Sequence, residues 1–165
     1  MVISKQRKIV LLFLSFFLSM QAWACHRATV AADSSVAAKS MDEQILYYTN
    51  KFRQSKGLAP LQLVSTISKE AEDHSQDMAK GRTGFGHEGF EERVDHVGKK
   101  LGRVAAAAEN VAYGNLDAEG VVNGWIKSPG HRRNMLGDYN LIGIGSAQGK
   151  GNIIFFTQVF IKSQK

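Results

Sequence analysis

Cysteine and proline are scarce in this sequence. Its 165 residues contain one cysteine, Cys25, and two prolines, Pro60 and Pro129. A lone cysteine excludes an internal disulfide, so hydrophobic packing has to hold the fold together. Because Cys25 stands before the folded part of the chain, a cysteine–histidine nucleophile inside the fold is excluded as well.

Long hydrophobic runs are also missing, except at the N-terminus. Three basic residues stand before an apolar run from Ile9 to Met20, and the triplet Ala22-Trp23-Ala24 follows it. This order is typical of a secretory signal peptide, which we expect over residues 1–24. The run is too short for a membrane span, and no later segment is apolar enough to cross a bilayer. We therefore expect a secreted, periplasmic or cell-envelope protein whose remaining chain is one ordinary domain.

The position of Cys25, directly after the expected cleavage site, allows two interpretations. Cys25 could become the lipidated first residue of a bacterial lipoprotein and anchor the protein to a membrane. It could instead be an incidental residue beside an ordinary cleavage site, because Ala22 and Trp23 are not the residues that lipoprotein signals usually carry there. Both interpretations stay open.

The charge balance argues against nucleic acid as a partner. The formal net charge is +6, but three basic residues leave with the signal and about +3 remains. This charge is mild and evenly spread, whereas nucleic-acid binding needs a concentrated basic patch. Loose attraction to an anionic envelope surface is still compatible with it.

Three familiar catalytic signatures are absent. The stretch GIGSAQG has Gln148 where a dinucleotide-binding fingerprint needs a glycine. No serine lies in a G-x-S-x-G turn. The stretch HEGFE, which starts at His87, has Glu91 where a zinc-protease helix needs its second histidine.

The helical part of the chain is expected to start after a tether. Residues 25–40 are small and polar, which predicts a flexible tether, and the domain is expected over residues 41–165. Apolar residues recur at helical spacing from Met41 toward Gly57 and from Ile67 to Met78. Further helices are expected near residues 91–99, over residues 116–128, and from Ser128, as cap, with Pro129 in the first turn.

The last third of the chain changes to a strand pattern. NLIGIGSA and NIIFFTQVFIK are rich in β-branched and aromatic residues, and QGKGN joins them, which predicts a β-hairpin. The second strand is apolar on both faces, so helices must cover both sides of it. We therefore predict the α/β class: an α/β/α sandwich with a small, mostly antiparallel sheet between helical layers.

Three residues stand out as candidates for a site: His87 in GFGHEGF, Glu109 in AENVAYG and His131 in SPGHRRNML. His131 should lie in the first turn of its helix, where the helix dipole favours a neutral imidazole. Two neutral imidazoles and a carboxylate could form a divalent-metal or proton-transfer site. Glu109 follows four alanines, which we expect to pass close beneath neighbouring elements before Val111 and Tyr113 enter the sheet.

Other polar residues are better explained as structural. Asn50, Arg53, Asn110 and Asn134 are expected to hold backbone and helix ends. His74 shares a helical stripe with apolar residues, so a buried, hydrogen-bonded role is expected for it.

Several stretches, in order, resemble the signatures of the CAP superfamily, also called the SCP or cysteine-rich secretory, antigen 5 and pathogenesis-related-1 domain. They are YYTNKFRQSKGLAPLQLVSTISKEAEDHSQDMAKGRTGFGHEGF, AENVAYG, VVNGWIKSPGHRRNML, LIGIGSA and FFTQVF. The likeness is greatest to short bacterial members without disulfides.

This resemblance implies an α/β/α sandwich with a central cavity, where two histidines and two glutamates hold a divalent cation, often zinc. Carried over by motif, the metal ligands would be His87, His131 and Glu109. The second glutamate's position is Ser128, a residue that would line the cleft without supplying charge, so the metal should bind more weakly.

Three functions follow as hypotheses. The first is a non-enzymatic binding module whose cleft holds a metal and a lipid, glycan or peptide of the envelope. The second is a metal-dependent hydrolase of envelope polymers or peptides with Glu109 as general base. The third is a purely structural trio, which an unpaired buried carboxylate would argue against because of its cost.

Overall fold

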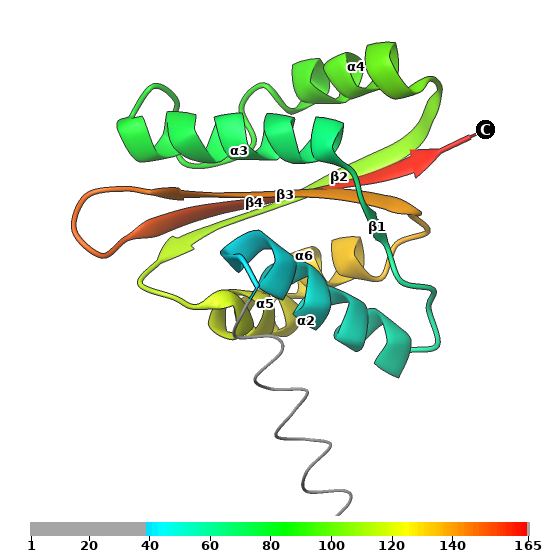
Figure 1. Cartoon of the computed structure of the whole chain (residues 1–165), viewed down its shortest axis with the longest axis horizontal. Helices are drawn as coiled ribbons and strands as arrows, with labels where there is room; N and C mark the ends of the chain where they lie inside the picture. The colour runs from blue at the N-terminus through cyan, green and yellow to red at the C-terminus, as the bar shows by residue number, and fades with distance from the viewer. Residues whose placement is uncertain (1–38, 165) are drawn as a thin grey trace, which may run out of the picture. The chain divides into compact units, whose positions relative to one another are not determined.

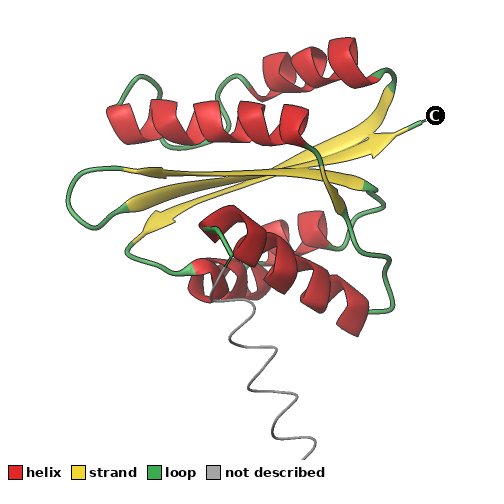
Figure 2. Cartoon of the chain, in the orientation of Figure 1, coloured by secondary structure: helices red, strands yellow, loops and turns green. Residues whose placement is uncertain are grey.

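The computed structural model describes residues 39–164, which form five helices and four strands (Figure 2). The helices are α2 (Met41–Ser55), α3 (Ser65–Lys80), α4 (Phe90–Leu101), α5 (Ala118–Lys127) and α6 (Pro129–Met135). The strands are β1 (Gln62–Leu63), β2 (Val104–Gly114), β3 (Leu141–Gln148) and β4 (Ile154–Ser163). The predicted signal peptide, Cys25 and almost the whole predicted tether lie outside the described residues.

The elements form three layers, as the two-sided apolar strand predicted. The sheet has the order β1-β3-β4-β2, with α3 and α4 on one face and α2, α5 and α6 on the other (Figure 1). Antiparallel pairing joins β3 to β4 and β4 to β2, whereas the short β1 runs parallel to β3. The α/β/α prediction is therefore confirmed, with a mixed sheet.

Strand β4 serves both hydrophobic cores. Phe156 and Phe160 pack with Trp125 and Ile45 on the side of α2 and α5. Val159 lies on the opposite face and packs against α3 and α4. All of these side chains are almost completely buried, so one strand joins the two helical layers through dispersion and apolar burial.

Helix α3 lies unusually close to β3. A side chain at Gly143 would overlap the backbone of Ile67, and one at Gly145 would overlap the backbone of Glu72. The glycines in LIGIGSA thus allow this close approach of a helix to a strand. The contact fixes α3, and with it the loop that follows α3.

Local signals explain most helix ends. The Ser40 side chain accepts a hydrogen bond from the Glu43 backbone, and the Glu43 side chain bonds back, which forms a capping box at α2. Gly81 ends α3 in the left-handed conformation. Ser128 occupies the expected cap position of α6 with Pro129 after it, but its side chain makes no capping hydrogen bond.

Two features of the sheet differ from expectation. The alanines at 105–108 are part of β2 itself, and Ala105 and Ala106 are exposed, so they do not pass beneath other elements. Strand β1 has only two residues, too few to give an apolar pattern. None of the described helices is long and apolar enough to cross a membrane.

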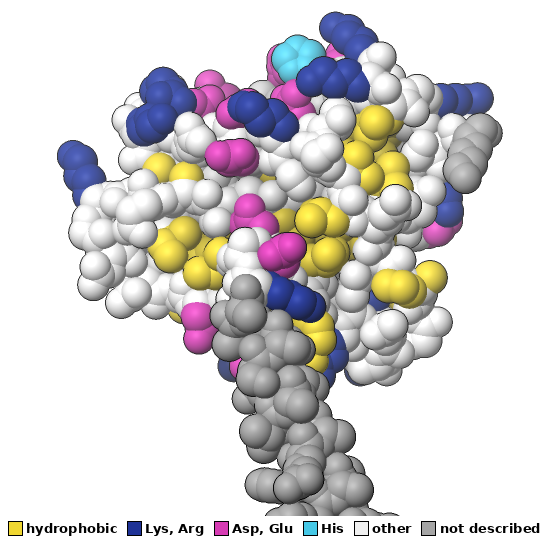
Figure 3. Space-filling model, in the orientation of Figure 1, with side chains coloured by type: hydrophobic (Ala, Val, Ile, Leu, Met, Phe, Trp, Pro, Cys, Tyr) yellow, Lys and Arg dark blue, Asp and Glu magenta, His cyan; other side chains and the backbone are white. Residues whose placement is uncertain are grey.

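The helical surface above the sheet is polar and of mixed charge. In the view of Figure 3, acidic and basic side chains alternate there, and hydrophobic side chains show only as small, separate patches. Such a surface is normal for a folded domain in water.

Candidate functional site at the free edge of the sheet

Strand β2 is an edge strand, and Glu109 lies in its middle. The other side of β2 has no partner strand in the described sheet, because β4 is its one neighbour. Two carbonyls on this free edge bind side chains: Asn134 donates to the Glu109 oxygen at 3.0 Å, and Trp125 donates to the Val111 oxygen at 3.3 Å. The Glu109 side chain points toward α3 and α4 and is only 1% exposed. The site is thus built around a buried carboxylate.

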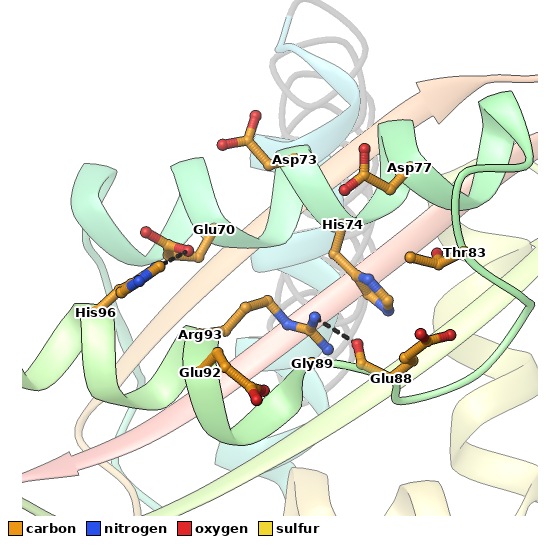
Figure 4. A pocket seen from close by; sticks show the side chains of 10 residues that line it. All are labelled: Glu70, Asp73, His74, Asp77, Thr83, Glu88, Gly89, Glu92, Arg93 and His96. Atoms are coloured by element: carbon orange, nitrogen blue, oxygen red, sulfur yellow. Dashed lines mark hydrogen bonds and ion pairs between the residues drawn. The ribbon is translucent and has the colours of Figure 1, made fainter.

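Arg93 of α4 neutralises this carboxylate. Its Nε donates to Oε2 of Glu109 at 3.0 Å, and its Nη2 lies 2.9 Å from Oε1 and 2.8 Å from Oε2. Nη1 of Arg93 donates to the Glu88 carbonyl at 2.8 Å, so the guanidinium is itself held in place (Figure 4). Both oxygens of Glu109 therefore have a charged partner, which offsets the cost of burial.

His87 completes the carboxylate's set of partners. Its Nδ1 lies 2.9 Å from Oε1 of Glu109. A carboxylate with both oxygens paired to a guanidinium accepts hydrogen bonds, so Nδ1 is the donor, and Nε2 holds the lone pair whenever the ring is neutral. The His87 side chain is 53% exposed. Glu109 thus orients an imidazole whose free nitrogen is available to solvent or a ligand.

The loop that carries His87 is anchored from below by His74. The buried His74 ring donates from Nε2 to the Gly86 carbonyl at 2.9 Å, which confirms the structural role expected for it. Burial lowers the pKa of His74, an effect that the bond to Gly86 partly opposes. His74 and Arg93 lie side by side in a pocket of about 260 Å³ between α3 and α4 (Figure 4).

Gly89 ends the loop and starts α4 with a φ of +73°. A side chain there would be strained, and its Cβ would lie 3.2 Å from Nη1 of Arg93. The glycine that follows His87 and Glu88 in GHEG therefore gives room to the guanidinium that holds Glu109.

His131 approaches from the other helical layer, on α6. Asn110 of β2 donates to the His131 carbonyl at 3.3 Å, and Asn134 donates to Oδ1 of Asn110 at 3.0 Å. These asparagines tie α6 to β2, as their predicted structural role requires. Burial, and to a lesser extent the charge of His87, lowers the pKa of His131. The expected neutral imidazole is thus supported, although burial rather than the helix dipole is the main cause.

The predicted trio is only partly in direct contact. His87 bonds to Glu109, and His131 is close enough to His87 for their charges to interact. Within residues 39–164, no group of three or more histidine, cysteine or acidic side chains is placed to hold a metal ion. No hydrogen bond joins the Ser128 side chain to the trio among the described contacts.

Only two of the three predicted metal ligands are free to bind a metal ion in this structure. The guanidinium of Arg93 sits against both Glu109 oxygens and would repel a divalent cation there. The free Nε2 of His87 and the imidazole of His131 remain as donors, with Glu109 behind His87 as the partner that orients it. Metal binding by His87 and His131 therefore stays a prediction, and Glu109 does not fit the role of a direct ligand in this arrangement.

Two exposed aromatic rings, one of them from the loop that carries His87, are in contact with each other. Among the described residues, the large hydrophobic side chains with exposed surface are Phe85, Tyr113 and Leu116. The Phe85 and Tyr113 rings meet edge to face at 4.7 Å, and Tyr113 stacks on Phe155 at 5.6 Å. Phe85 precedes His87 by two residues, and Tyr113 lies on the same face of β2 as Glu109. We call Phe85, Tyr113 and Phe155 the aromatic row.

Comparison with known proteins identifies the family. The model of the CAP family, described as the cysteine-rich secretory protein family, matches residues 46–160. The chain belongs to the CAP family. The family assignment agrees with the sequence motifs and with the three-layer fold.

Individual relatives are bacterial. The CAP chain is 39% identical over 137 residues to the protein YkwD of Bacillus subtilis, covering 81% of this chain and 51% of YkwD. It is similar to an extracellular SCP-domain protein from Bacillus anthracis, with a TM-score of 0.63, 28% identity, and coverage of 73% of this chain and 40% of that one. The chain thus spans about half, or less, of these two relatives.

A third likeness concerns the fold alone. An outer surface protein of Borrelia burgdorferi matches with a TM-score of 0.64 and 23% identity, over 74% of this CAP chain and 92% of that protein. At this level of identity the match shows a shared architecture.

Sequence reasoning missed two parts of this site. Arg93 carries a signal in hindsight, because it lies at helical spacing with Phe90 and Val97 on the buried side of α4. A basic residue on an apolar stripe requires buried hydrogen-bond acceptors, and a buried carboxylate is one such partner. The aromatic row had no such signal, since aromatic residues in strands and loops are usually core.

Proposed function

We propose that this CAP domain is an exported, non-enzymatic binding module that holds a lipid, glycan or peptide of the cell envelope at the free edge of its sheet. The aromatic row carries this proposal. Phe85 is 52% exposed and Tyr113 is 56% exposed, their rings are in contact, and Phe85 precedes the exposed His87 by two residues. Exposed hydrophobic groups gathered in one place, with polar groups beside them, mark a surface that contacts a ligand.

The polar groups would fix the orientation of the ligand. His87 offers Nε2 as an acceptor when it is neutral, and His131 offers a second imidazole from the opposite layer. A divalent metal, zinc by family resemblance, would be held by these two imidazoles and would attract oxygen atoms of the ligand. The binding proposal does not depend on the metal.

The alternative of a metal-dependent hydrolase with Glu109 as general base has less support. A general base needs a free lone pair within reach of the water it activates. Both Glu109 oxygens face Arg93, one of them also faces His87, and the side chain is almost fully buried. This geometry suits an orienting group better than a base.

Export is supported by the predicted signal peptide and by the descriptions of two similar proteins. One of these is described as extracellular and the other as an outer surface protein. We infer that this CAP domain also works outside the cytoplasm, in the periplasm, at the cell envelope or as a secreted protein.

The test measures binding and turnover in the same samples. The full chain is incubated with soluble peptidoglycan fragments, peptides or lipid vesicles, and each pool is analysed for retention and for cleavage. We expect retention of one pool without cleavage, at least tenfold weaker for Tyr113→Ala and unchanged for the control Tyr47→Ala on α2. Cleavage that is lost in Glu109→Gln would favour the hydrolase, and equal retention by both tyrosine variants would refute the role of the aromatic row.

A further inference from the structure

A second surface, at the junction of α5 and α6, combines positive charge with apolar groups. It is an open groove of about 530 Å³. Its charged members are Lys127, Arg132 and Arg133, and its apolar members are Ile126, Pro129 and Leu136. We call it the basic groove.

The charge of the basic groove is not compensated. No acidic residue lines it. None of its three cations forms an ion pair with another side chain of residues 39–164, whereas Lys69, Arg82 and Lys162 each pair with an aspartate. Arg132 instead lies over the Phe52 ring at 6.0 Å, an aromatic face that holds the guanidinium without neutralising its charge. The groove is therefore complementary to an anionic partner.

The apolar residues of the basic groove indicate which kind of anionic partner it fits. Pro129 is exposed, and Ile126 and Leu136 are partly exposed between the cations. A soluble anion would need only the charges. A membrane interface presents anionic headgroups above acyl chains, and it is bound by cationic side chains that flank apolar ones.

We propose that the basic groove docks the domain on an anionic lipid bilayer. The proposal goes beyond ligand binding at the aromatic row and requires only that the protein is exported. It also fits the length of chain before the domain. The segment from Cys25 to Ser40 can span at most about 55 Å, and Met41 lies only about 17 Å along α2 from Phe52 at the groove. A bilayer that held Cys25 would be within reach of the groove.

Docking would also bring the helix that carries His131 to the membrane. Arg132 and Arg133 directly follow His131 on α6, and α6 is tied to β2 through Asn134. A bilayer against the basic groove would therefore contact the same short helix that carries His131.

Vesicle binding tests the proposal with matched charge variants. The full chain carries Cys25→Ser, so that no acyl chain contributes. The groove variant is Lys127→Gln/Arg132→Gln/Arg133→Gln, and the control is Lys99→Gln/Lys100→Gln/Arg103→Gln, which removes the same charge from exposed positions at the end of α4. All variants are compared by sedimentation with phosphatidylglycerol and with phosphatidylcholine vesicles, so that any contribution of the N-terminal residues is the same throughout.

We expect the parent chain to bind phosphatidylglycerol vesicles much more strongly than phosphatidylcholine vesicles. The groove variant should bind about a hundredfold more weakly, at about fivefold per charge, and the control should change less than about threefold. Equal losses in both variants would mean that net charge alone acts, and would overturn the proposal. So would equal binding to both lipids, or full displacement by millimolar inorganic phosphate, which would indicate a site for soluble anions.

Discussion

The ion pair between Arg93 and Glu109 gives the sharpest test of the site's construction. In Arg93→Met, the apolar stem is kept but the carboxylate loses its only cationic partner of permanent charge. The Glu109 side chain is 1% exposed and that of Arg93 is 10% exposed, so water cannot replace the guanidinium well. Removing one member of a buried pair costs about 3–5 kcal/mol. We therefore expect the free energy of unfolding to fall by about that amount, which lowers Tm by roughly 10–20 °C in a domain of this size.

A double-mutant cycle supplies the control. Urea unfolding is measured for Arg93→Met, for Glu109→Leu and for the combination, with Arg103→Met as an exposed control that should cost less than about 0.5 kcal/mol. Because the double variant leaves no unpaired charge, it should be more stable than Arg93→Met alone. If Arg93→Met costs under about 1 kcal/mol, or if the two single changes simply add, the pair does not stabilise the site and our account of it fails.

Three further predictions follow. Zinc titration by calorimetry should show that the parent chain binds zinc, and that this binding is at least tenfold weaker in His87→Ala and in His131→Ala. The control His96→Ala should bind zinc as the parent does. If zinc produces no heat of binding with the parent chain, the metal prediction is wrong. Burial lowers the pKa of His74 below its ordinary value of 6.5, so as the pH falls below about 6.5 the unfolded chain takes up a proton before the folded one, and the free energy of unfolding should decrease. The variant His74→Gln should make the free energy of unfolding depend less steeply on pH between pH 7 and 5. An unchanged pH dependence would argue against this role of His74. Gly145→Ala should lower the free energy of unfolding by more than about 2 kcal/mol, because the added carbon overlaps the backbone of α3, and a loss no larger than at the exposed Gly124 would show that α3 can shift freely.

Much of the fold could be predicted because the local sequence patterns agree with the way the elements pack in the structure. The stripe from Ile67 to Met78 defines α3, and Gly81 ends that helix where expected. The two apolar faces of β4 required cover on both sides, and the structure provides it. The alanines before Glu109 could not be placed in the same way, since alanine favours helices over strands and shows no alternation of its own.

The site was predictable as a set of residues but not as a set of contacts. Motifs indicated His87, Glu109 and His131, and two of them do bond to each other. The charged partner of Glu109 is Arg93, which lies sixteen positions earlier in the chain and reaches it because α4 crosses β2. That crossing depends on how the layers pack, so the residue spacing within α4 or within β2 could not predict it.

The side chains that fix α6 to β2 also limit how the domain can associate. An edge strand with free carbonyls is a template on which another strand can add, and long edges of this kind promote aggregation. In the middle of β2, Asn134 and Trp125 occupy two of these carbonyls. An incoming strand would have to displace both and pull α5 and α6 away from the sheet. The bonds that hold α5 and α6 to β2 therefore also oppose the addition of another strand at this edge.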